Sequence, residues 1–273
     1  MSSETVTGAE RIASAFAAAR EEGRAALMPY MMAGFPDRET SLAVAAAYAE
    51  SGADLVELGV PFSDPLADGP TIHAAATAAL EAGATLATAL ETCRSVSARL
   101  PVVLMVYANM VLAHGGAEEF AALIAAAGAA GAIVPDLPLG EDDEVRAALA
   151  GEGLALVPLV APTTAPPRRR QICERAEGFI YLVSTTGTTG ERAAVPAHLA
   201  ELAAATREDA AGTPVAVGFG ISTPEQAGEV GRIADGVIIG SRLVRAAAEA
   251  GSAQAAADAV GEFLSETRVS LAR

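Results

Sequence analysis

Short runs of consecutive apolar residues alternate with longer amphipathic stretches along almost the whole chain. Eight such runs stand out, at residues 26–33, 54–59, 101–107, 131–136, 154–160, 179–184, 214–220 and 236–240. They do not alternate apolar with polar positions, which is typical of parallel strands covered on both faces. Alanine-rich stretches with helical spacing separate the runs. The pattern therefore predicts eight strand and helix units.

Eight such units match a (β/α)8 TIM barrel, an α/β fold that commonly forms one domain of about 250 residues. The chain has 273 residues and shows no linker or change in composition, so we expect residues 1–273 to form a single barrel domain. Before the first strand, residues 9–22 are amphipathic, with Ile12, Phe16 and Ala19 on one side. They predict an extra N-terminal helix that closes the base of the barrel.

The composition combines an aliphatic interior with a large acidic excess. Aromatic residues make up only 4% of the chain, so Ala, Val, Leu and Ile must fill the core. The net charge of −16 would repel nucleic acids and anionic membranes, and we expect neither as a partner. We expect no signal peptide, no membrane span, and free thiols at Cys93 and Cys173, which together indicate the cytoplasm.

The basic residues exclude one route to carbon–carbon bond cleavage. All 18 of them are arginine, and an aldolase that works through a Schiff base needs a lysine amine. A metal-assisted route is also disfavoured, because His73, His114 and His198 fall on different predicted segments. We therefore expect no metal site.

Two carboxylates near the end of the second run are candidates for acid/base catalysis. Glu57 lies inside the apolar run, where burial should raise its pKa toward the neutral range. Asp68 follows in a loop that Pro61, Pro65 and Pro70 stiffen, so it can lie back over the strand end. Two carboxylates in contrasting environments suit proton transfer. On the pattern alone an alternative is equally open, in which Glu57 pairs with an arginine and Asp68 is an ordinary turn residue.

Glycines follow the last three runs, where barrels of this kind often bind a phosphate group. They are Gly187 and Gly190 after the sixth run, Gly218 and Gly220 at the seventh, and Gly240 before Ser241 at the start of the final helix. Backbone N–H groups and a helix N-terminus can bind an anion without a cationic side chain. Tight turns also need glycine for backbone reasons, but three sets at three strand ends favour a phosphorylated substrate.

Four motifs carry a resemblance to a known family. They are ELGVPFSDPLADGPTI at residues 57–72, IVPDLP at 133–138, GFGIS at 218–222 and DGVIIGS at 235–241. The chain from about residue 24 to 244 resembles the tryptophan synthase alpha subunit, and the first motif is close to diagnostic. The resemblance implies a lyase of tryptophan biosynthesis that cleaves indole-3-glycerol phosphate to indole and glyceraldehyde 3-phosphate. This retro-aldol reaction uses no cofactor of the subunit's own.

The resemblance also implies roles for individual residues. Glu57 would be the general acid/base, and Asp68 would accept a hydrogen bond from the indole N–H. The residues that would surround the indole are Tyr30, Ile72, Met105, Ile133, Tyr181 and Phe219. The residues that would hold the phosphate are Gly190, Gly220, Gly240 and Ser241.

The family works as an alpha2beta2 complex with a beta subunit that uses pyridoxal phosphate and receives the indole through a tunnel. The resemblance implies that partner, which would face the loop that contains Asp64, Pro65 and Asp68 and the turn at Pro138. Residues 184–190 depart from the family, since they read STTGTTG where many members resemble SRxGVTG. Two other interpretations stay open, a free-standing indole-releasing lyase and a non-catalytic activator of a beta subunit, although retention of both carboxylates disfavours the second. A sugar-phosphate isomerase is a more distant alternative.

Overall fold

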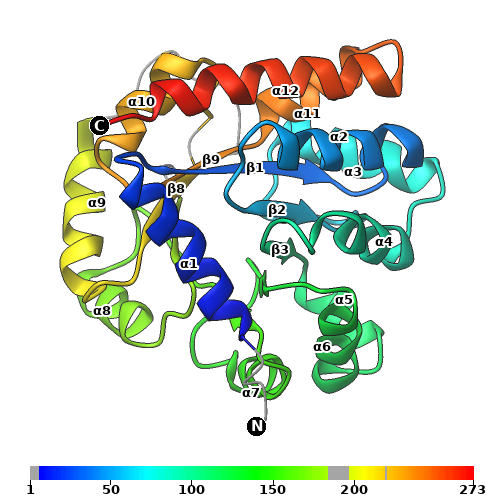
Figure 1. Cartoon of the computed structure of the whole chain (residues 1–273). Coiled ribbons are helices and arrows are strands. Elements are labelled where there is room, and N and C mark those ends of the chain that lie inside the picture. Colours follow the sequence, from blue (N-terminus) through cyan, green and yellow to red (C-terminus); the bar gives the residue numbers. More distant parts are fainter. Residues whose placement is uncertain (1–5, 184–196, 219) are drawn as a thin grey trace, which may run out of the picture.

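Parallel strands form a ring inside a layer of helices in the computed structural model, which describes residues 6–183, 197–218 and 220–273 (Figure 1). The strands follow the order β5-β4-β3-β2-β1-β9-β8-β7-β6. Because β1 pairs with β9, the first and last strands lie side by side. The strands are β1 (Ala26–Met32), β2 (Val56–Gly59), β3 (Val102–Met105), β4 (Gly131–Ile133), β5 (Ala155–Leu156), β6 (Leu159–Val160), β7 (Ile180–Val183), β8 (Val215–Gly218) and β9 (Gly236–Ile239).

The ring closes through the fifth predicted strand, which is divided into β5 and β6. The N–H of Val157 donates to the carbonyl of Ala132 at 2.9 Å, and the carbonyl of Pro158 accepts from Tyr181 at 2.9 Å. One piece of chain therefore pairs with β4 through its first half and with β7 through its second. Pro158 has no N–H to donate, which accounts for the break. The expected (β/α)8 barrel is confirmed, with its fifth strand interrupted.

The helices surround the ring, and polar caps define several of their starts. The carboxylate of Asp37 accepts from the N–H of Thr40 at 2.8 Å at the start of α2, and Thr7 forms a capping box with Glu10 at the start of α1. Gly83, with a φ of +88°, separates α3 from α4. The described helices are α1 (Gly8–Glu21), α2 (Arg38–Glu50), α3 (Pro70–Glu81), α4 (Leu86–Val96), α5 (Ala108–Ala113), α6 (Ala117–Ala126), α7 (Asp143–Gly151), α8 (Pro166–Glu174), α9 (Ala197–Asp209), α10 (Pro224–Gly231), α11 (Ser241–Glu249) and α12 (Ala253–Ser270).

Side chains that alternate along the strands fill two cores. Leu27 and Val102 pack against the surrounding helices, whereas their neighbours Met28 and Val103 belong to a second cluster inside the ring. Glu57 stands between Val56 and Leu58, two residues of the outer core, so its side chain points into the ring. No helix in the described ranges is long and apolar enough to cross a membrane.

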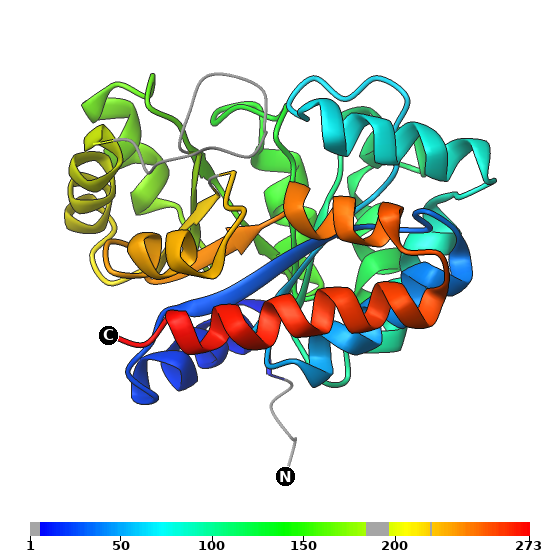
Figure 2. The same ribbon diagram turned by 90° about the horizontal axis from the view of Figure 1, so that it is seen from above.

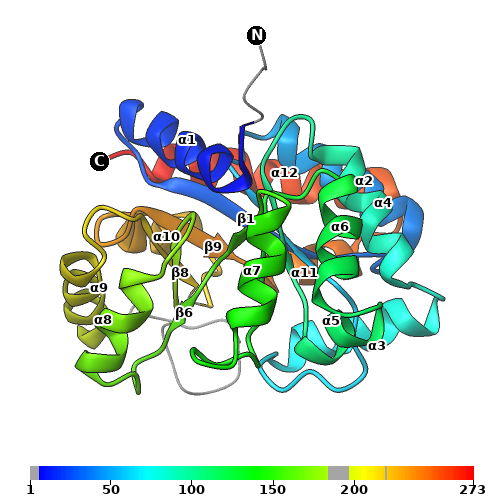
Figure 3. The ribbon, with the colours of Figure 1, turned by 90° about the horizontal axis from the view of Figure 1, so that it is seen from below.

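Helix α1 closes one end of the ring. Its residues Ile12, Phe16 and Ala19 are buried in the inner cluster, and the ring of Phe16 lies 5.7 Å from that of Phe179. Seen from above and from below relative to Figure 1, α1 lies at one end of the molecule, and the loop before α3 lies at the other (Figures 2 and 3). The expected N-terminal helix at the base is confirmed, and the C-terminal ends of the strands open at the opposite end, which we call the mouth.

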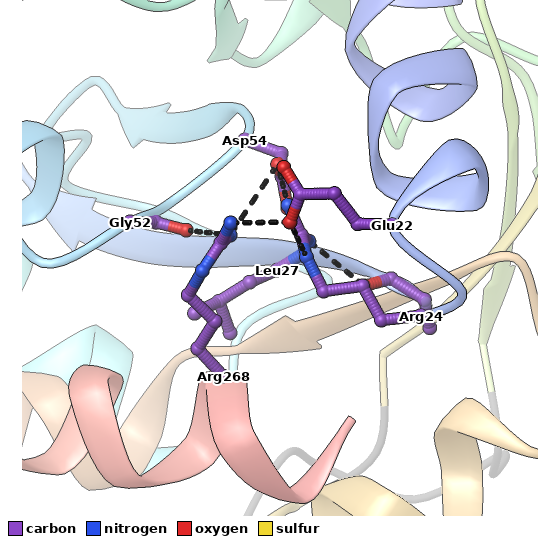
Figure 4. Close-up of polar contacts among 7 residues, drawn as sticks. Glu22, Arg24, Leu27, Gly52, Asp54 and Arg268 are labelled. Atoms are coloured by element: carbon purple, nitrogen blue, oxygen red, sulfur yellow. Dashed lines mark hydrogen bonds and ion pairs between the residues drawn. The ribbon is translucent and has the colours of Figure 1, made fainter. Parts of the chain in front are cut away.

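Four charged residues at the base form what we call the basal cluster, made of Glu22, Arg24, Asp54 and Arg268 (Figure 4). Arg24 donates to both carboxylate oxygens of Asp54, at 2.5 and 2.8 Å, and its Nε lies 2.8 Å from Glu22. Arg268, near the end of α12, also binds Glu22. Asp54 further accepts from the N–H of Leu27 at 2.7 Å. The basal cluster thus joins α1 and α12 to the starts of the first two strands.

Candidate active site

Glu57 lies in the middle of β2, with its carboxylate buried inside the ring. Only 2% of the residue is exposed, and its Oε2 has no hydrogen-bond partner among the described residues. Burial, together with the nearby charge of Asp68, raises the pKa of Glu57 to about 8. No arginine in the described ranges forms an ion pair with Glu57, and Arg24, just before β1, pairs with Asp54 instead. Glu57 can therefore exchange a proton near neutral pH.

Asp68 lies in the loop between β2 and α3, where the side chain of Tyr107 holds the loop. The hydroxyl of Tyr107 hydrogen-bonds the carboxylate of Asp68 and accepts from the N–H of Ala67 at 3.1 Å. Its ring also stacks on Phe62 at 5.2 Å. Burial raises the pKa of Asp68 above its ordinary value, and the Tyr107 hydrogen bond and nearby His73 oppose this rise. The loop thus returns to the strand end, as the prolines predict.

Tyr107 is a residue of the site that the sequence analysis missed. The pattern places it at the end of the third strand, whereas it follows that strand and serves as the N-cap of α5. Its contact with Asp68 joins positions 39 residues apart, and local patterns do not reveal such a contact. A polar aromatic residue just beyond the apolar strand 102–105 is the one signal that points to it.

Five of the six residues expected around an indole come together at the mouth. Tyr30, Ile72 and Met105 share one apolar cluster, and Met105 also packs with Ile133 and Tyr181. Neighbouring strands bring them close, since Met105 is in register with Ile133. The sixth residue, Phe219, lies outside the described residues. The five side chains provide an apolar wall beside the two carboxylates.

Two glycines make room for tyrosine side chains that lean across neighbouring strands. A Cβ on Gly59 would lie 2.1 Å from the hydroxyl oxygen of Tyr30, and one on Gly218 would lie 2.5 Å from that of Tyr181. Gly218 is therefore required by Tyr181, whatever it contributes near an anion. Burial, with the charges of both carboxylates, raises the pKa of each tyrosine well above its ordinary value. Both phenols stay protonated.

The candidate phosphate residues lie at the ends of the last strands. Gly240 is the N-cap of α11, no side chain caps this helix, and Ser241 is buried at its first position. Gly220 follows β8, and β8 neighbours β9. Gly220 therefore lies on the same side of the mouth as Gly240, which follows β9. Free N–H groups in the first turn of a helix attract anions. The fourth candidate, Gly190, and Gly187 both fall outside the described residues, as does the whole departing loop 184–190.

The described residues contain no group of three or more His, Cys, Asp or Glu side chains placed to hold a metal ion. The chemistry that can be read from them is proton transfer by carboxylates. In (β/α)8 barrels the active site lies at the C-terminal ends of the strands, and Glu57 and Asp68 are found at that end. The fold and the site thus define a (β/α)8-barrel enzyme.

Comparison with known proteins identifies the family. The model described as "Tryptophan synthase alpha chain" matches residues 16–270. The tryptophan synthase alpha chain of Chloroflexus aggregans is 48% identical over 86% of this chain and 88% of the relative, and that of Gloeobacter violaceus is 49% identical over 88% and 87%. The chain belongs to the tryptophan synthase alpha chain family, and as a member it is a lyase of tryptophan biosynthesis.

Solved structures agree with this assignment. A structure of Mycobacterium tuberculosis tryptophan synthase superposes with a TM-score of 0.89 at 36% identity, covering 96% of this chain and 98% of that one. Tryptophan synthase subunit alpha from Legionella pneumophila superposes with a TM-score of 0.84 at 35% identity, over 96% and 98%. The overall fold of this chain is therefore shared with these solved proteins.

Proposed function

We propose that Glu57 and Asp68 carry out the alpha reaction of this family, the retro-aldol cleavage of indole-3-glycerol phosphate. Protonated Glu57 gives its proton to C3 of the indole ring, and Asp68 accepts a hydrogen bond from the ring N–H as positive charge develops on the nitrogen. The Glu57 carboxylate then removes the proton of the hydroxyl on the carbon attached to the ring. The bond to the ring breaks, its electrons neutralise the iminium, and indole and glyceraldehyde 3-phosphate leave.

One observation carries this proposal: the carboxylate of Glu57 is buried, its Oε2 has no partner among the described residues, and the charge of Asp68 acts on it. A group that must both give and take a proton works best with a pKa near the operating pH, and that of Glu57 is about 8. Glu57 ends the cycle protonated, as it began, so no external acid or base is needed. Asp68 has a different task, since its charge stabilises the iminium.

We assign the indole ring and the phosphate of the substrate to two further groups of residues at the mouth. Tyr30, Ile72, Met105, Ile133 and Tyr181 would surround the indole ring, with Phe219 as the proposed sixth contact. Gly220, Gly240 and Ser241 would hold the phosphate through backbone N–H groups at the start of α11, with Gly190 as the proposed fourth member.

We infer that the chain works with a tryptophan synthase beta subunit in an alpha2beta2 complex. The matched Mycobacterium tuberculosis protein is a tryptophan synthase, described in an aminoacrylate-bound form. Two apolar side chains beside the mouth are exposed, Leu66 in the loop after β2 and Leu112 in α5, by 86% and 62%. Exposed apolar residues on a loop that carries a candidate catalytic group suit a partner that couples to catalysis.

Three further properties belong to the same proposal. We infer that residues 1–273 act as one barrel domain, because the first and last strands pair in one sheet. The reaction proceeds by proton transfer alone, so the chain needs no cofactor of its own, and pyridoxal phosphate is expected in the beta subunit. The buried free thiols of Cys93 and Cys173 suit a reducing compartment and support a cytoplasmic location.

Indole release from indole-3-glycerol phosphate tests the proposal, measured with the purified chain alone and with a beta subunit added. The chain contains no tryptophan, which removes its background from a fluorescence assay. Slow release that rises strongly with the partner supports the two-subunit function. Fast release without any response to the partner would assign a free-standing lyase. No release in either case, with activation of the beta subunit, would assign a non-catalytic subunit and overturn the proposal.

A further inference from the structure

Tyr30 lies between Glu57, the proposed general acid/base, and Gly240, which belongs to the proposed phosphate site. On one side its strand β1 pairs with β2, and Tyr30 is in register with Glu57. On the other side β1 pairs with β9, whose end leads to Gly240, and a Cβ on Gly240 would lie 3.6 Å from the Cβ of Tyr30. Tyr30 thus separates the candidate acid/base from the candidate phosphate site.

The hydroxyl of Tyr30 is held in a space kept free for it. It lies over Gly59, two residues beyond Glu57 on the same face of β2. Tyr30 is 4% exposed, and Glu57 Oε2 is the buried unpartnered side-chain atom found among the described residues, so the Tyr30 hydroxyl is not sealed from the space at the mouth. A ligand that removes this hydroxyl from water must replace its hydrogen bond. Burial and the carboxylate charges raise the pKa of Tyr30 well above its ordinary value, so the group remains a hydrogen-bond donor.

The substrate offers a suitable partner at this place. A three-carbon chain joins the indole ring to the phosphate, and this chain must pass Tyr30 if the ring lies by Asp68 and the phosphate by Gly240. The chain carries two hydroxyls, and Glu57 deprotonates the one next to the ring. We propose, building on the function proposed above, that the Tyr30 hydroxyl hydrogen-bonds the second hydroxyl and selects substrates that carry it.

This role is distinct from that of the Tyr30 ring. The ring packs in the apolar cluster with Ile72 and Met105, where a phenylalanine would serve equally well. The requirement for glycine at position 59, however, arises from the hydroxyl and the ring end that bears it. A site with a buried donor loses affinity for a ligand that leaves the donor unpaired. The hydroxyl should therefore act on selectivity for the substrate's side chain.

The test compares two ligands in variants that cannot turn over substrate. Dissociation constants are measured by calorimetry for Glu57→Gln and for Glu57→Gln combined with Tyr30→Phe. The ligands are indole-3-glycerol phosphate and indole-3-propanol phosphate, which has the same ring, chain and phosphate but neither hydroxyl. We expect Tyr30→Phe to weaken binding of the first ligand about fivefold to tenfold and to change binding of the second less than twofold.

Tyr48→Phe is the matched control, because it removes another buried tyrosine hydroxyl that bonds the carbonyl of Tyr30 at 2.9 Å from outside the ring. It should lower the melting temperature and leave the ratio of the two dissociation constants unchanged. Equal weakening of both ligands by Tyr30→Phe, or no weakening of either, would overturn the inference. The proposed function fails separately, if the unmodified chain with its beta subunit releases no indole.

Discussion

Two carboxylates three residues apart, Asp54 just before β2 and Glu57 within it, show how one short segment serves two purposes. Both are largely removed from water. At the base, Asp54 receives two hydrogen bonds from Arg24 and one from the N–H of Leu27. Toward the mouth, Glu57 keeps an oxygen without any partner among the described residues. Pairing makes the first carboxylate part of the scaffold, whereas the unpaired oxygen of the second suits the proton transfer that we propose for it.

The largest expected effect is the loss of turnover when Glu57 is made neutral. Glu57→Gln preserves the shape of the side chain and removes its exchangeable proton, so indole release should fall at least 10³-fold while substrate affinity stays within about tenfold. Indole release and calorimetric binding measure the two quantities. Asp54→Asn is the matched variant at the base and should reduce turnover of the folded protein less than about threefold. Near-normal turnover by Glu57→Gln would remove Glu57 from the mechanism.

For stability, in contrast to turnover, we expect a large effect from the removal of Asp54. Asp54→Ala leaves Arg24, which is 6% exposed, without its main buried partner. We expect the free energy of unfolding to fall by about 3–5 kcal/mol in urea titrations. The control is Glu91→Ala, which breaks the exposed pair with Arg38 and should cost less than about 1 kcal/mol. Similar losses for the two variants would show that the buried pair of the basal cluster contributes no more to stability than an exposed pair.

The pH dependence of stability sharpens the comparison further. The pKa of Glu57 rises from an ordinary 4.5 to about 8 on folding, so between these values the folded state holds a proton that the unfolded state has lost. Glu57 therefore stabilises the fold at low pH, and this contribution declines as pH rises toward 8. Between pH 5.5 and 7.5 the stability of Glu57→Gln should gain roughly 2–3 kcal/mol relative to the parent chain.

Urea titrations of both proteins at several pH values provide the measurement. The difference should stop growing above about pH 8, once Glu57 is ionised in both states. A difference that does not change with pH would mean that Glu57 titrates at its ordinary value, and that the unpaired oxygen reaches water.

The smallest effect is expected from Tyr107→Phe, which removes a hydroxyl that hydrogen-bonds Asp68. This bond lowers the pKa of Asp68, so its loss should raise that pKa and move the acid limb of the kcat/KM profile to higher pH. We expect a fivefold to tenfold lower kcat/KM at pH 7 and a larger loss below it. A uniform loss at every pH would assign Tyr107 a purely structural role.

The barrel follows from the sequence, because parallel strands covered on both faces leave uninterrupted apolar runs. The positions of Glu57 and of three proposed pocket residues, Tyr30, Met105 and Ile133, follow too, because they lie in or next to such runs. The division of the fifth strand at Pro158 is not evident from the apolar pattern, although proline is its physical cause. Arg24 can pair with Asp54 or with Glu57, and which of the two it pairs with depends on the face of the chain that each carboxylate occupies.

The two glycines beneath the tyrosines have a consequence for anyone who wishes to alter this pocket. Side chains at positions 59 or 218 would occupy volume already taken by Tyr30 and Tyr181, so libraries that vary these positions should yield mostly inactive or misfolded proteins. Met105 is half-buried, unbranched and shared by two clusters. It is therefore the side chain beside the mouth that can best adapt to a different ligand. Acceptance of indoles with bulky ring substituents should be sought by shortening Met105 while both glycines are kept.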